Sequence, residues 1–531
     1  MRLRDFRGTR ALATIDRSRS HTRSRHPCPV RHCAGSQGGC MAGTRGIVIT
    51  LAMLAMASPE ACRATPAFDR SGWQADHAAL KQILAHDYAH LAWVASPQGG
   101  VDLPALDASA QRALAEAHTD AQAAQALRTF LAGFHDGHLS LLDPLEQAPS
   151  SPAPAAVDPR ALGAGAGCAL LGVSDEGRHD FSLPLDTLPG YHPLNDVADP
   201  MLRAGTLSLP DGHTIGLLRL HEFDALRYPG VCHALWPQLR QADATAEMRG
   251  TVGRSWVAAI AASLRRFQQD GVDAVLVDVG DNPGGDDSGD TLARLFTSQP
   301  VASAVLEVSQ SAAGKPYLDE QYERLDDALR HHHPNAAARR LLSTQRAAFQ
   351  ASRQAVAMPP CDLSWAWHTQ QAWDAAPCRR LVAAGTSGGP LPSPAVDTLD
   401  DFLIAHRLDW AQDLRGHWGA WNGPVYVLTN GKTASSAEMF AARMQDNHIA
   451  RIVGTHSGGY GCGFMSADAP PELPHSHLRV RVPNCVRLRA DGSDEVAGIT
   501  PDLPVIPRSG ESARARAQRV VDTLASDIGM H

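Results

Sequence analysis

The sequence predicts an α/β (α+β) protein in which an N-terminal helical bundle precedes a core of alternating strands and helices. Ala and Leu recur at helical spacing through residues 70–135, whereas short apolar runs typical of buried strands begin near Thr214. Amphipathic helical patterns separate these runs, which is the alternation expected of an α/β core. The chain has 531 residues, of which 44% are hydrophobic and 20% charged, enough for a large core and two or three domains.

The N-terminus differs from the rest of the chain. Residues 1–40 contain nine arginines and no apolar periodicity, so we expect them not to fold and interpret them as a mis-assigned extension upstream of a true start at Met41. Residues 41–64 have the layout of a secretory signal peptide, with an apolar run over 47–57. We therefore expect a periplasmic or extracellular protein. Because no other stretch approaches 18 consecutive apolar residues, no integral membrane segment is expected after signal cleavage.

Cysteine usage agrees with export. Six cysteines follow residue 64, and an even number in an exported chain indicates disulfides. Sequence proximity favours the pairs Cys361–Cys378 and Cys462–Cys485, which would leave Cys168 with Cys232. No CxxC pair occurs after residue 64, so a zinc site of that type has no support, and we expect neither a metal nor a cofactor. The net charge of −8 and the scattered basic residues give no reason to expect nucleic acid as a partner.

Three regions follow the signal segment. Residues 66–145 form a predicted helical domain, with helices over 73–88, 103–118 and 119–134, and this domain ends in the turn Phe134-His135-Asp136-Gly137-His138. Residues 146–210 are interpreted as a linker or irregular segment, because 146–165 are rich in Pro, Ala and Gly and 170–210 contain several prolines without a regular pattern. Residues 211–531 form the predicted core domain, which carries a mostly helical insertion over 306–420. The tryptophans of this insertion are interpreted as packing residues rather than as an aromatic entrance to a site.

Within the core domain, strands are predicted over 215–220, 274–279, 425–429 and 450–455, and helices over 251–269, 433–446 and 511–528. At the join between strand 425–429 and helix 433–446, Thr433 is the predicted N-cap and Glu438 lies in the first turn. Ser435 then lies at the helix start, with its own amide and that of Ser436 expected to be free for a developing oxyanion. This is the geometry that an acyl-transfer nucleophile needs.

The stretch TASSAEMFAARMQDN (433–447), followed by RIVGTHSGG (451–459), resembles the core of the tail-specific (C-terminal processing) serine peptidases and of their relatives, the tricorn core and the interphotoreceptor retinoid-binding protein repeats. The resemblance implies a ClpP/crotonase-like β-α core, a peptide or protein substrate, and Ser435 as nucleophile. Residues 278–285, Asp-Val-Gly-Asp-Asn-Pro-Gly-Gly, are similar to a second family motif, which implies that Gly284 or Gly285 joins Ser436 as oxyanion donor.

The base implied by the resemblance is a histidine. The lysine of the tail-specific peptidases is replaced here by Tyr460, and Lys432 is too close to Ser435 along the chain to substitute for it. In the tricorn-like branch a histidine from the N-terminal region is the base. His138 is the matching position, with His135 as competitor. Glu495 lies near the position of the tricorn glutamate, which implies that it orients and charge-stabilises the base.

Two functions remain open at this stage. The first is an exported serine endopeptidase that hydrolyses peptide bonds through an acyl-enzyme on Ser435. The second is a catalytically inactive family member that binds a peptide or a lipophile. Many tail-specific peptidases carry a PDZ domain in the region that corresponds to 146–210. The carboxylate-binding loop of such a domain is not found in this segment, so we expect the domain to be missing or vestigial.

Overall fold

The structure is a computed structural model that describes residues 68–144, 157–174, 181–194, 199, 202–242, 244–373, 378–465 and 469–529. The predicted N-terminal extension and signal segment, residues 1–40 and 41–64, lie outside the described residues.

The N-terminal helices follow the predicted periodicity closely. They are α1 (Arg70–Asp87), α2 (Leu91–Val94), α3 (Leu103–Glu116) and α4 (Asp120–Ala132). The three long helices pack on one another, and each begins at a residue whose side chain accepts a hydrogen bond from a first-turn N–H: Asp69, Asp102 and Thr119. Residue 138 lies six residues after the end of α4, at the entrance to a short strand.

The core is a seven-stranded sheet in the order β12-β9-β8-β5-β4-β3-β2, in which β4, β5, β8, β9 and β12 are parallel. Its strands are β2 (Tyr191–Pro193), β3 (Leu202–Ser208), β4 (Thr214–Leu220), β5 (Ala274–Asp278), β8 (Val425–Thr429), β9 (Arg451–Gly454) and β12 (Leu503–Pro504). All five residues of β5 and of β8 are buried, as expected for a sheet covered on both faces.

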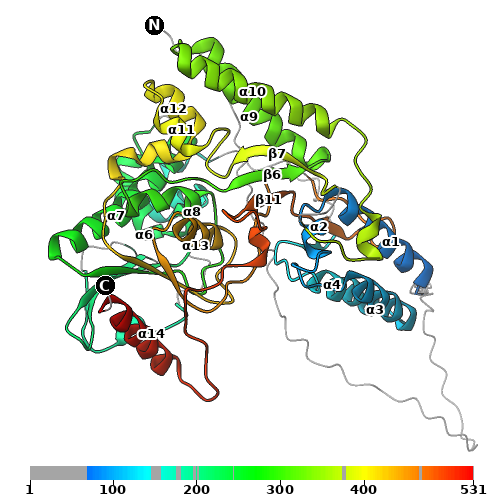
Figure 1. Ribbon diagram of the computed structural model, residues 1–531, viewed down its shortest axis with the longest axis horizontal. Helices are drawn as coiled ribbons and strands as arrows, with labels where there is room; N and C mark the ends of the chain where they lie inside the picture. Colours follow the sequence, from blue (N-terminus) through cyan, green and yellow to red (C-terminus); the bar gives the residue numbers. More distant parts are fainter. Residues whose placement is uncertain are drawn as a thin grey trace, which may run out of the picture. The chain divides into compact units, whose positions relative to one another are not determined.

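Side chains of successive strand residues enter two different cores. Val275 and Val277 of β5 pack on one side of the sheet, whereas Leu276 packs on the other. The first core is closed by α6 (Pro229–Leu239), α7 (Thr245–Asp270), the 3-10 helix Leu292–Phe296 and α13 (Ser436–Asp446). The second is closed by α14 (Ala513–Ile528), drawn in red on the opposite side of the strands in Figure 1. The N-terminal end of α13 is thereby fixed at the C-terminal end of β8.

The sheet begins earlier in the chain than expected. The segment interpreted as a linker, 146–210, contains α5 (Ala164–Leu170) and the two strands β2 and β3. The strand β3 pairs with β4 over its whole length, and Cys168 of α5 is bonded to Cys232 of α6. The abundance of Pro, Ala and Gly therefore conceals elements that belong to the core domain.

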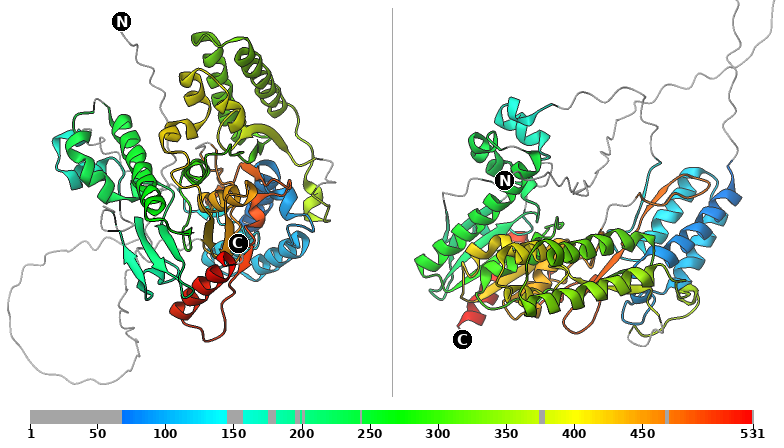
Figure 2. Two further views of the ribbon diagram at one scale, coloured as in Figure 1. Left: turned by 60° about the vertical axis from the view of Figure 1, so that its left-hand side comes forward. Right: turned by 90° about the horizontal axis from the view of Figure 1, so that it is seen from above.

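The insertion contains two strands as well as the predicted helices. Strand β6 (Val305–Ser309) pairs with β7 (Leu381–Thr386) and with β11 (Cys485–Leu488). The helices are α9 (Lys315–His331), α10 (Ala336–Val356), α11 (Ser393–Asp397) and α12 (Phe402–Leu408). The long pair α9 and α10 lies side by side in the right-hand view of Figure 2. The predicted disulfides Cys361–Cys378 and Cys462–Cys485 are both formed, so all three predicted pairs are confirmed.

A two-stranded sheet connects the N-terminal helices to the C-terminal part of the core. Strand β1 (Ser140–Leu142) pairs antiparallel with β10 (Arg479–Arg481), so that Ser140 lies opposite Arg481. This pairing anchors the turn that carries His138 against residues more than 300 positions away in the sequence.

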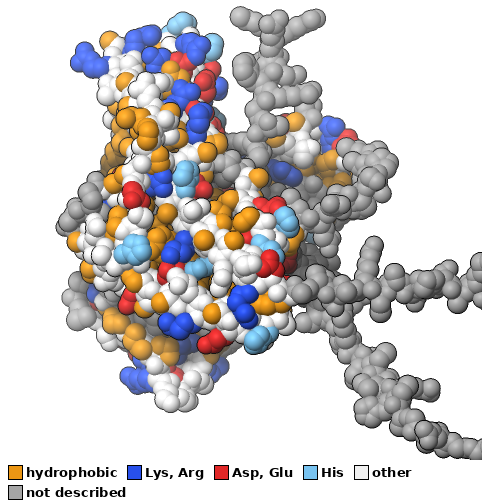
Figure 3. All heavy atoms as spheres, turned by 90° about the vertical axis from the view of Figure 1, so that its right-hand side faces the viewer, with side chains coloured by type: hydrophobic (Ala, Val, Ile, Leu, Met, Phe, Trp, Pro, Cys, Tyr) orange, Lys and Arg blue, Asp and Glu red, His pale blue; other side chains and the backbone are white. Residues whose placement is uncertain are grey.

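Basic, acidic and hydrophobic side chains are interspersed on the face shown in Figure 3, so that face presents no broad field of a single charge. Within the described ranges, no helix is both long enough and apolar enough to cross a membrane.

Candidate active site

Ser435 occupies a strained turn between β8 and α13. Its main chain has φ 54° and ψ −117°, a conformation that costs a non-glycine residue about 1–3 kcal/mol and therefore needs support from its surroundings. The Ser435 N–H donates to Glu438 at 3.0 Å, and the Ala434 N–H donates to the Asn282 carbonyl at 3.0 Å. The turn holds the serine at the end of a buried strand, like the strained strand-to-helix turns that expose nucleophiles in other hydrolases.

Two details of the predicted turn are wrong. The N-cap is Ser435 rather than Thr433, because the Thr433 hydroxyl donates to the Val279 carbonyl at 2.8 Å and accepts from the Asn430 N–H. The Ser435 amide is also not free for an oxyanion, since Glu438 occupies it. The N-cap therefore lies two residues later than the sequence pattern suggests.

His138 lies directly against this serine. Its Nε2 is 3.0 Å from Ser435 Oγ, and its Nδ1 is 2.9 Å from the main-chain carbonyl of Tyr460. A carbonyl oxygen can only accept, so Nδ1 carries the proton and Nε2 directs its lone pair at the serine hydroxyl. His135, the competing histidine, is exposed and takes no part in this contact.

The environment of His138 keeps its ring neutral. Burial lowers the pKa of the imidazole to about 3, against the opposing effect of the Tyr460 carbonyl, and the positive charge of Arg487 lowers it further. The ring is therefore unprotonated at neutral pH and able to accept a proton. The cost of charging it must be offset by a nearby negative group.

Asp136 places a carboxylate next to His138, and sequence reasoning did not select it. Its side chain is buried and accepts hydrogen bonds from the main-chain N–H of His138 at 2.9 Å and from the Tyr88 hydroxyl at 2.9 Å. One of its oxygens lies 3.7 Å from His138 Nδ1. Burial raises the pKa of Asp136 to about 6, so it is ionised at neutral pH. Its place two residues before the histidine was the available signal, but a short turn motif does not reveal which side chain points inward.

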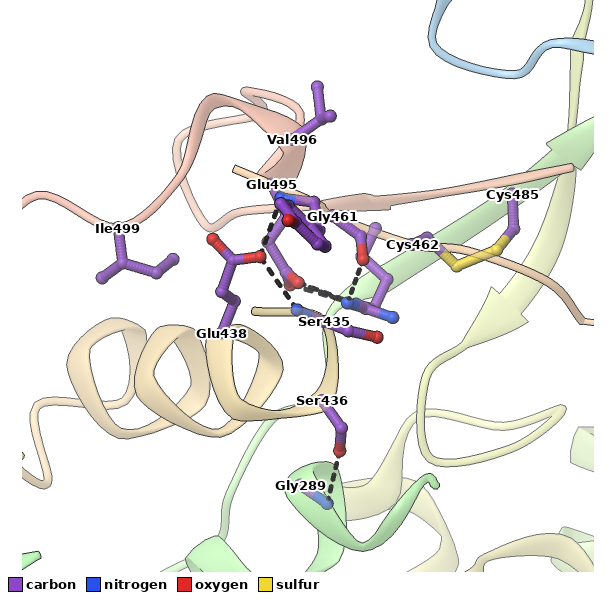
Figure 4. Close-up of polar contacts among 12 residues, drawn as sticks. Gly289, Ser435, Ser436, Glu438, Gly461, Cys462, Cys485, Glu495, Val496 and Ile499 are labelled. Atoms are coloured by element: carbon purple, nitrogen blue, oxygen red, sulfur yellow. Dashed lines mark hydrogen bonds and ion pairs between the residues drawn. A yellow bond between two sulfur atoms is a disulfide. The ribbon is translucent and has the colours of Figure 1, made fainter. Parts of the chain in front are cut away.

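Glu438 connects the serine turn to the turn that carries Tyr460. The carboxylate is fully buried and accepts hydrogen bonds from the Ser435 N–H (3.0 Å), the Ser457 hydroxyl (2.6 Å), the Gly459 N–H (2.6 Å) and the Tyr460 N–H (2.8 Å). Figure 4 shows it between Ser435 and the overlying loop. Burial raises its pKa to about 7, and the hydrogen bonds from Ser457, Tyr460 and Gly459 oppose this shift. One carboxylate thus fixes both the turn of Ser435 and the carbonyl that orients His138.

The candidate oxyanion donors separate into free and occupied amides. The Ser436 and Gly285 N–H groups have no hydrogen-bond partner in the part of the chain that the structure describes. The Gly284 N–H instead donates to the Asn282 side chain at 2.9 Å. The absence of a side chain at Gly284 lets its main chain pack tightly against Ser435, since a Cβ added there would lie 2.7 Å from Ser435 Cβ. Of the two glycines left open by the sequence, Gly285 has the available donor.

No contact joins Glu495 to His138 among the described residues, so its predicted role in orienting and charge-stabilising the base stays a prediction that can act only through other groups. The carboxylate pairs with Arg487, whose Nε lies 3.0 and 3.1 Å from its two oxygens, and both side chains are buried. Arg487 also donates to the Gly461 carbonyl at 2.8 Å. Glu495 therefore braces the main chain next to Tyr460, as Figure 4 shows for Gly461 and Glu495, rather than the imidazole itself.

A second buried ion pair fastens the N-terminal helices to this loop. His90 Nδ1 lies 2.6 Å from Asp494, and its Nε2 lies 2.9 Å from the Cys462 carbonyl. Since both ring nitrogens face acceptors, both carry protons. Burial disfavours this charge, but Asp494 outweighs burial and raises the pKa of His90 to about 9.

No lysine occupies the family position. Tyr460 stands there, and its ring contacts the ring of His138 edge-on at 5.7 Å between centroids. Lys432 is exposed and lies 3.7 Å from Asp281. Asp446, the last residue of α13, pairs with Arg489.

The chain is similar to known peptidases in sequence pattern and in fold. The family model described as "Peptidase family S41" matches residues 214–505. Among solved structures, mature CPAF is similar with 15% identity and a TM-score of 0.53, covering 86% of this chain and 98% of that one. Mature CPAF complexed with lactacystin gives 15% identity, a TM-score of 0.52, and coverage of 86% and 99%. The photosystem II D1 C-terminal processing protease matches at 14% identity and a TM-score of 0.30, covering 86% and 98%. No curated protein matches the sequence.

The likeness to CPAF shows a shared fold, and the family model spans more than half of the 531 residues, including the strand, turn and helix that carry Ser435. The chain belongs to peptidase family S41.

Proposed function

We propose that the chain is an exported serine endopeptidase that hydrolyses peptide bonds through an acyl-enzyme on Ser435, with His138 in place of the lysine used by the tail-specific peptidases. The observation that carries this proposal is the 3.0 Å contact between Ser435 Oγ and the unprotonated Nε2 of His138. A serine hydroxyl needs such a base, because it is a weak nucleophile while protonated.

In the first step, Ser435 Oγ forms a bond to the substrate carbonyl carbon while His138 Nε2 takes the hydroxyl proton. The negative charge that develops on the carbonyl oxygen accepts hydrogen bonds from the Ser436 and Gly285 N–H groups. The imidazolium that forms is stabilised by ionised Asp136, 3.7 Å from Nδ1. It then returns its proton to the amine of the leaving peptide as the C–N bond breaks.

In the second step, water attacks the acyl-enzyme and loses a proton to His138, and the acid product leaves as Ser435 recovers its hydrogen. The Tyr460 carbonyl holds the Nδ1–H throughout. Nε2 therefore serves as the base and then as the acid in both steps. Glu438 and the Glu495–Arg487 pair keep that carbonyl in place. We assign these three residues to positioning.

Export is supported by the three disulfides, since such bonds persist in oxidising compartments. The signal-peptide pattern of residues 41–64 points in the same direction.

A fluorophosphonate probe tests the nucleophile and the base together. The wild-type protein should be labelled on Ser435, the Ser435→Ala variant should not, and His138→Ala should lose labelling about 10²–10⁴-fold. The matched control is His135→Ala, because this exposed histidine lies three residues away and leaves the site intact. Mass spectrometry of peptide digests then identifies the bonds cleaved. A wild-type protein that is folded, unlabelled and inactive on peptides, yet retains them, would be the binding protein considered above.

A further inference from the structure

Arg481 lies beside the candidate base on the strand that pairs with β1. Its backbone faces Ser140, two residues after His138. Its guanidinium stacks over the ring of Phe464 at 4.2 Å, and Phe464 in turn contacts the His138 ring edge-on, with 5.7 Å between centroids. The three side chains therefore form a continuous row, His138–Phe464–Arg481, which starts at the reacting serine.

The described residues supply no counterion for the charge at the end of this row. No carboxylate in the described part of the chain pairs with Arg481, and no hydrogen bond of its guanidinium is found there. Burial lowers its pKa, and no neighbouring charge opposes that shift. A half-buried guanidinium without an anion is costly, so the site is suited to an anionic group that arrives from outside. The planar guanidinium binds carboxylates in particular, with two parallel hydrogen bonds.

The position of the row relative to the reaction indicates which part of a substrate reaches it. The oxyanion donors Ser436 and Gly285 lie on the side of α13 and the 284–285 turn, whereas His138 approaches Ser435 from the N-terminal domain. Because His138 must hand its proton to the leaving amine, the leaving segment of the substrate runs along the His138 side. Phe464 contacts His138 and Arg481 stacks on Phe464, so the row begins on the leaving-group side.

We propose that Arg481 binds a substrate carboxylate on the leaving-group side of the scissile bond, and that it makes the enzyme select acidic leaving segments. This inference rests on the proposed peptidase function. The carboxylate has two possible sources: the side chain of an acidic residue within two positions of the scissile bond, or the C-terminal carboxylate of a short leaving peptide.

Matched peptides separate these sources. One pair differs only in Asp or Asn at the second position after the scissile bond, with the C-terminus amidated. The other pair has Asn there and ends after that position in a free acid or an amide. In wild type, kcat/KM should be about 10–100-fold higher for the acidic member of at least one pair, the range expected for one charge-assisted hydrogen-bonded pair. The Arg481→Gln variant should lose this ratio.

Two controls isolate the role of Arg481. Arg479→Gln changes an arginine on the same strand whose Nε donates to the Asp143 carbonyl, and it should keep the wild-type ratio. An activated ester that has no residue beyond the scissile bond should be hydrolysed equally by wild type and Arg481→Gln. If Arg481→Gln slows the ester and all four peptides alike, the arginine acts on His138 or on the fold, and the proposal is overturned. A preference for carboxylates only on the acyl side would overturn it as well.

A binding measurement keeps the inference testable apart from catalysis. Ser435→Ala protein is titrated with the same four peptides, labelled with a fluorophore, and binding is followed by anisotropy. The acidic member of a pair should bind at least 10-fold more tightly, and the double variant Ser435→Ala/Arg481→Gln should bind both members equally. Equal binding by the Ser435→Ala protein itself would refute the role of Arg481, whereas absent labelling of wild-type Ser435 would refute the peptidase function.

Discussion

Replacing Gly284 by alanine should displace the serine turn and reduce catalysis far more than stability. The glycine has φ 105°, and a Cβ placed there would lie 2.7 Å from Ser435 Cβ, 2.8 Å from the Ala434 carbonyl and 2.8 Å from the Ser436 nitrogen. Ordinary contacts begin near 3.4 Å, so the two turns must separate by about 0.6–0.7 Å.

Catalytic groups have to be held within about 0.5 Å of their productive geometry, and a misplacement of about 1 Å costs on the order of 10²-fold in rate. We therefore expect kcat/KM for a peptide substrate to fall roughly 10²-fold in Gly284→Ala. The free energy of unfolding, measured with urea, should fall by only about 1–3 kcal/mol, the range for overpacking and a strained backbone.

The matched control is Gly431→Ala. Gly431 lies in the same strand-to-helix turn, but a Cβ added there meets no atom within 4 Å. This variant should keep wild-type kcat/KM. If Gly284→Ala has wild-type kcat/KM, or if both variants lose activity equally, then close packing of the 284–285 turn against Ser435 does not set the geometry of the site.

Three further predictions concern buried charges. Glu438→Ala leaves three main-chain N–H groups without their acceptor, so the unfolding free energy in urea should fall by about 2–4 kcal/mol; an unchanged midpoint would contradict this. Asp136→Asn keeps an acceptor for the His138 N–H but removes a charge 3.7 Å from its ring, so kcat/KM should fall about 10-fold with little change in stability; an unchanged rate would show that this charge does not assist. The folded-state pKa of His90 is raised from 6.5 to about 9 by Asp494, so its contribution to stability is complete below pH 6.5 and is lost as pH rises through 9. Urea unfolding at pH 6 and pH 9 should show this decrease in wild type and a smaller one in His90→Gln.

Local patterns sufficed for most of the elements. The predicted strand 425–429 coincides with β8, and the predicted helix 251–269 lies within α7, because apolar periodicity reflects which side a residue buries. The linker interpretation of 146–210 did not match, since β3 is a core strand whose pattern is obscured by its Pro- and Gly-rich neighbours. Composition describes a segment as a whole, whereas strand pairing depends on a partner elsewhere in the chain.

In the candidate site, too, some features follow from local sequence and others from long-range packing. The sequence by itself determined the residue types and the turn that places Ser435 at a helix start, because helix and strand propensities act over a few residues. Only the tertiary structure decided that His138 lies 3.0 Å from this serine across a separation of 297 residues, and that Glu495 meets Arg487 instead. The orientation of the base depends on a main-chain carbonyl, that of Tyr460, and every residue has one. Which carbonyl faces the imidazole is fixed by long-range packing, through the buried Glu438 and the pairing of β1 with β10.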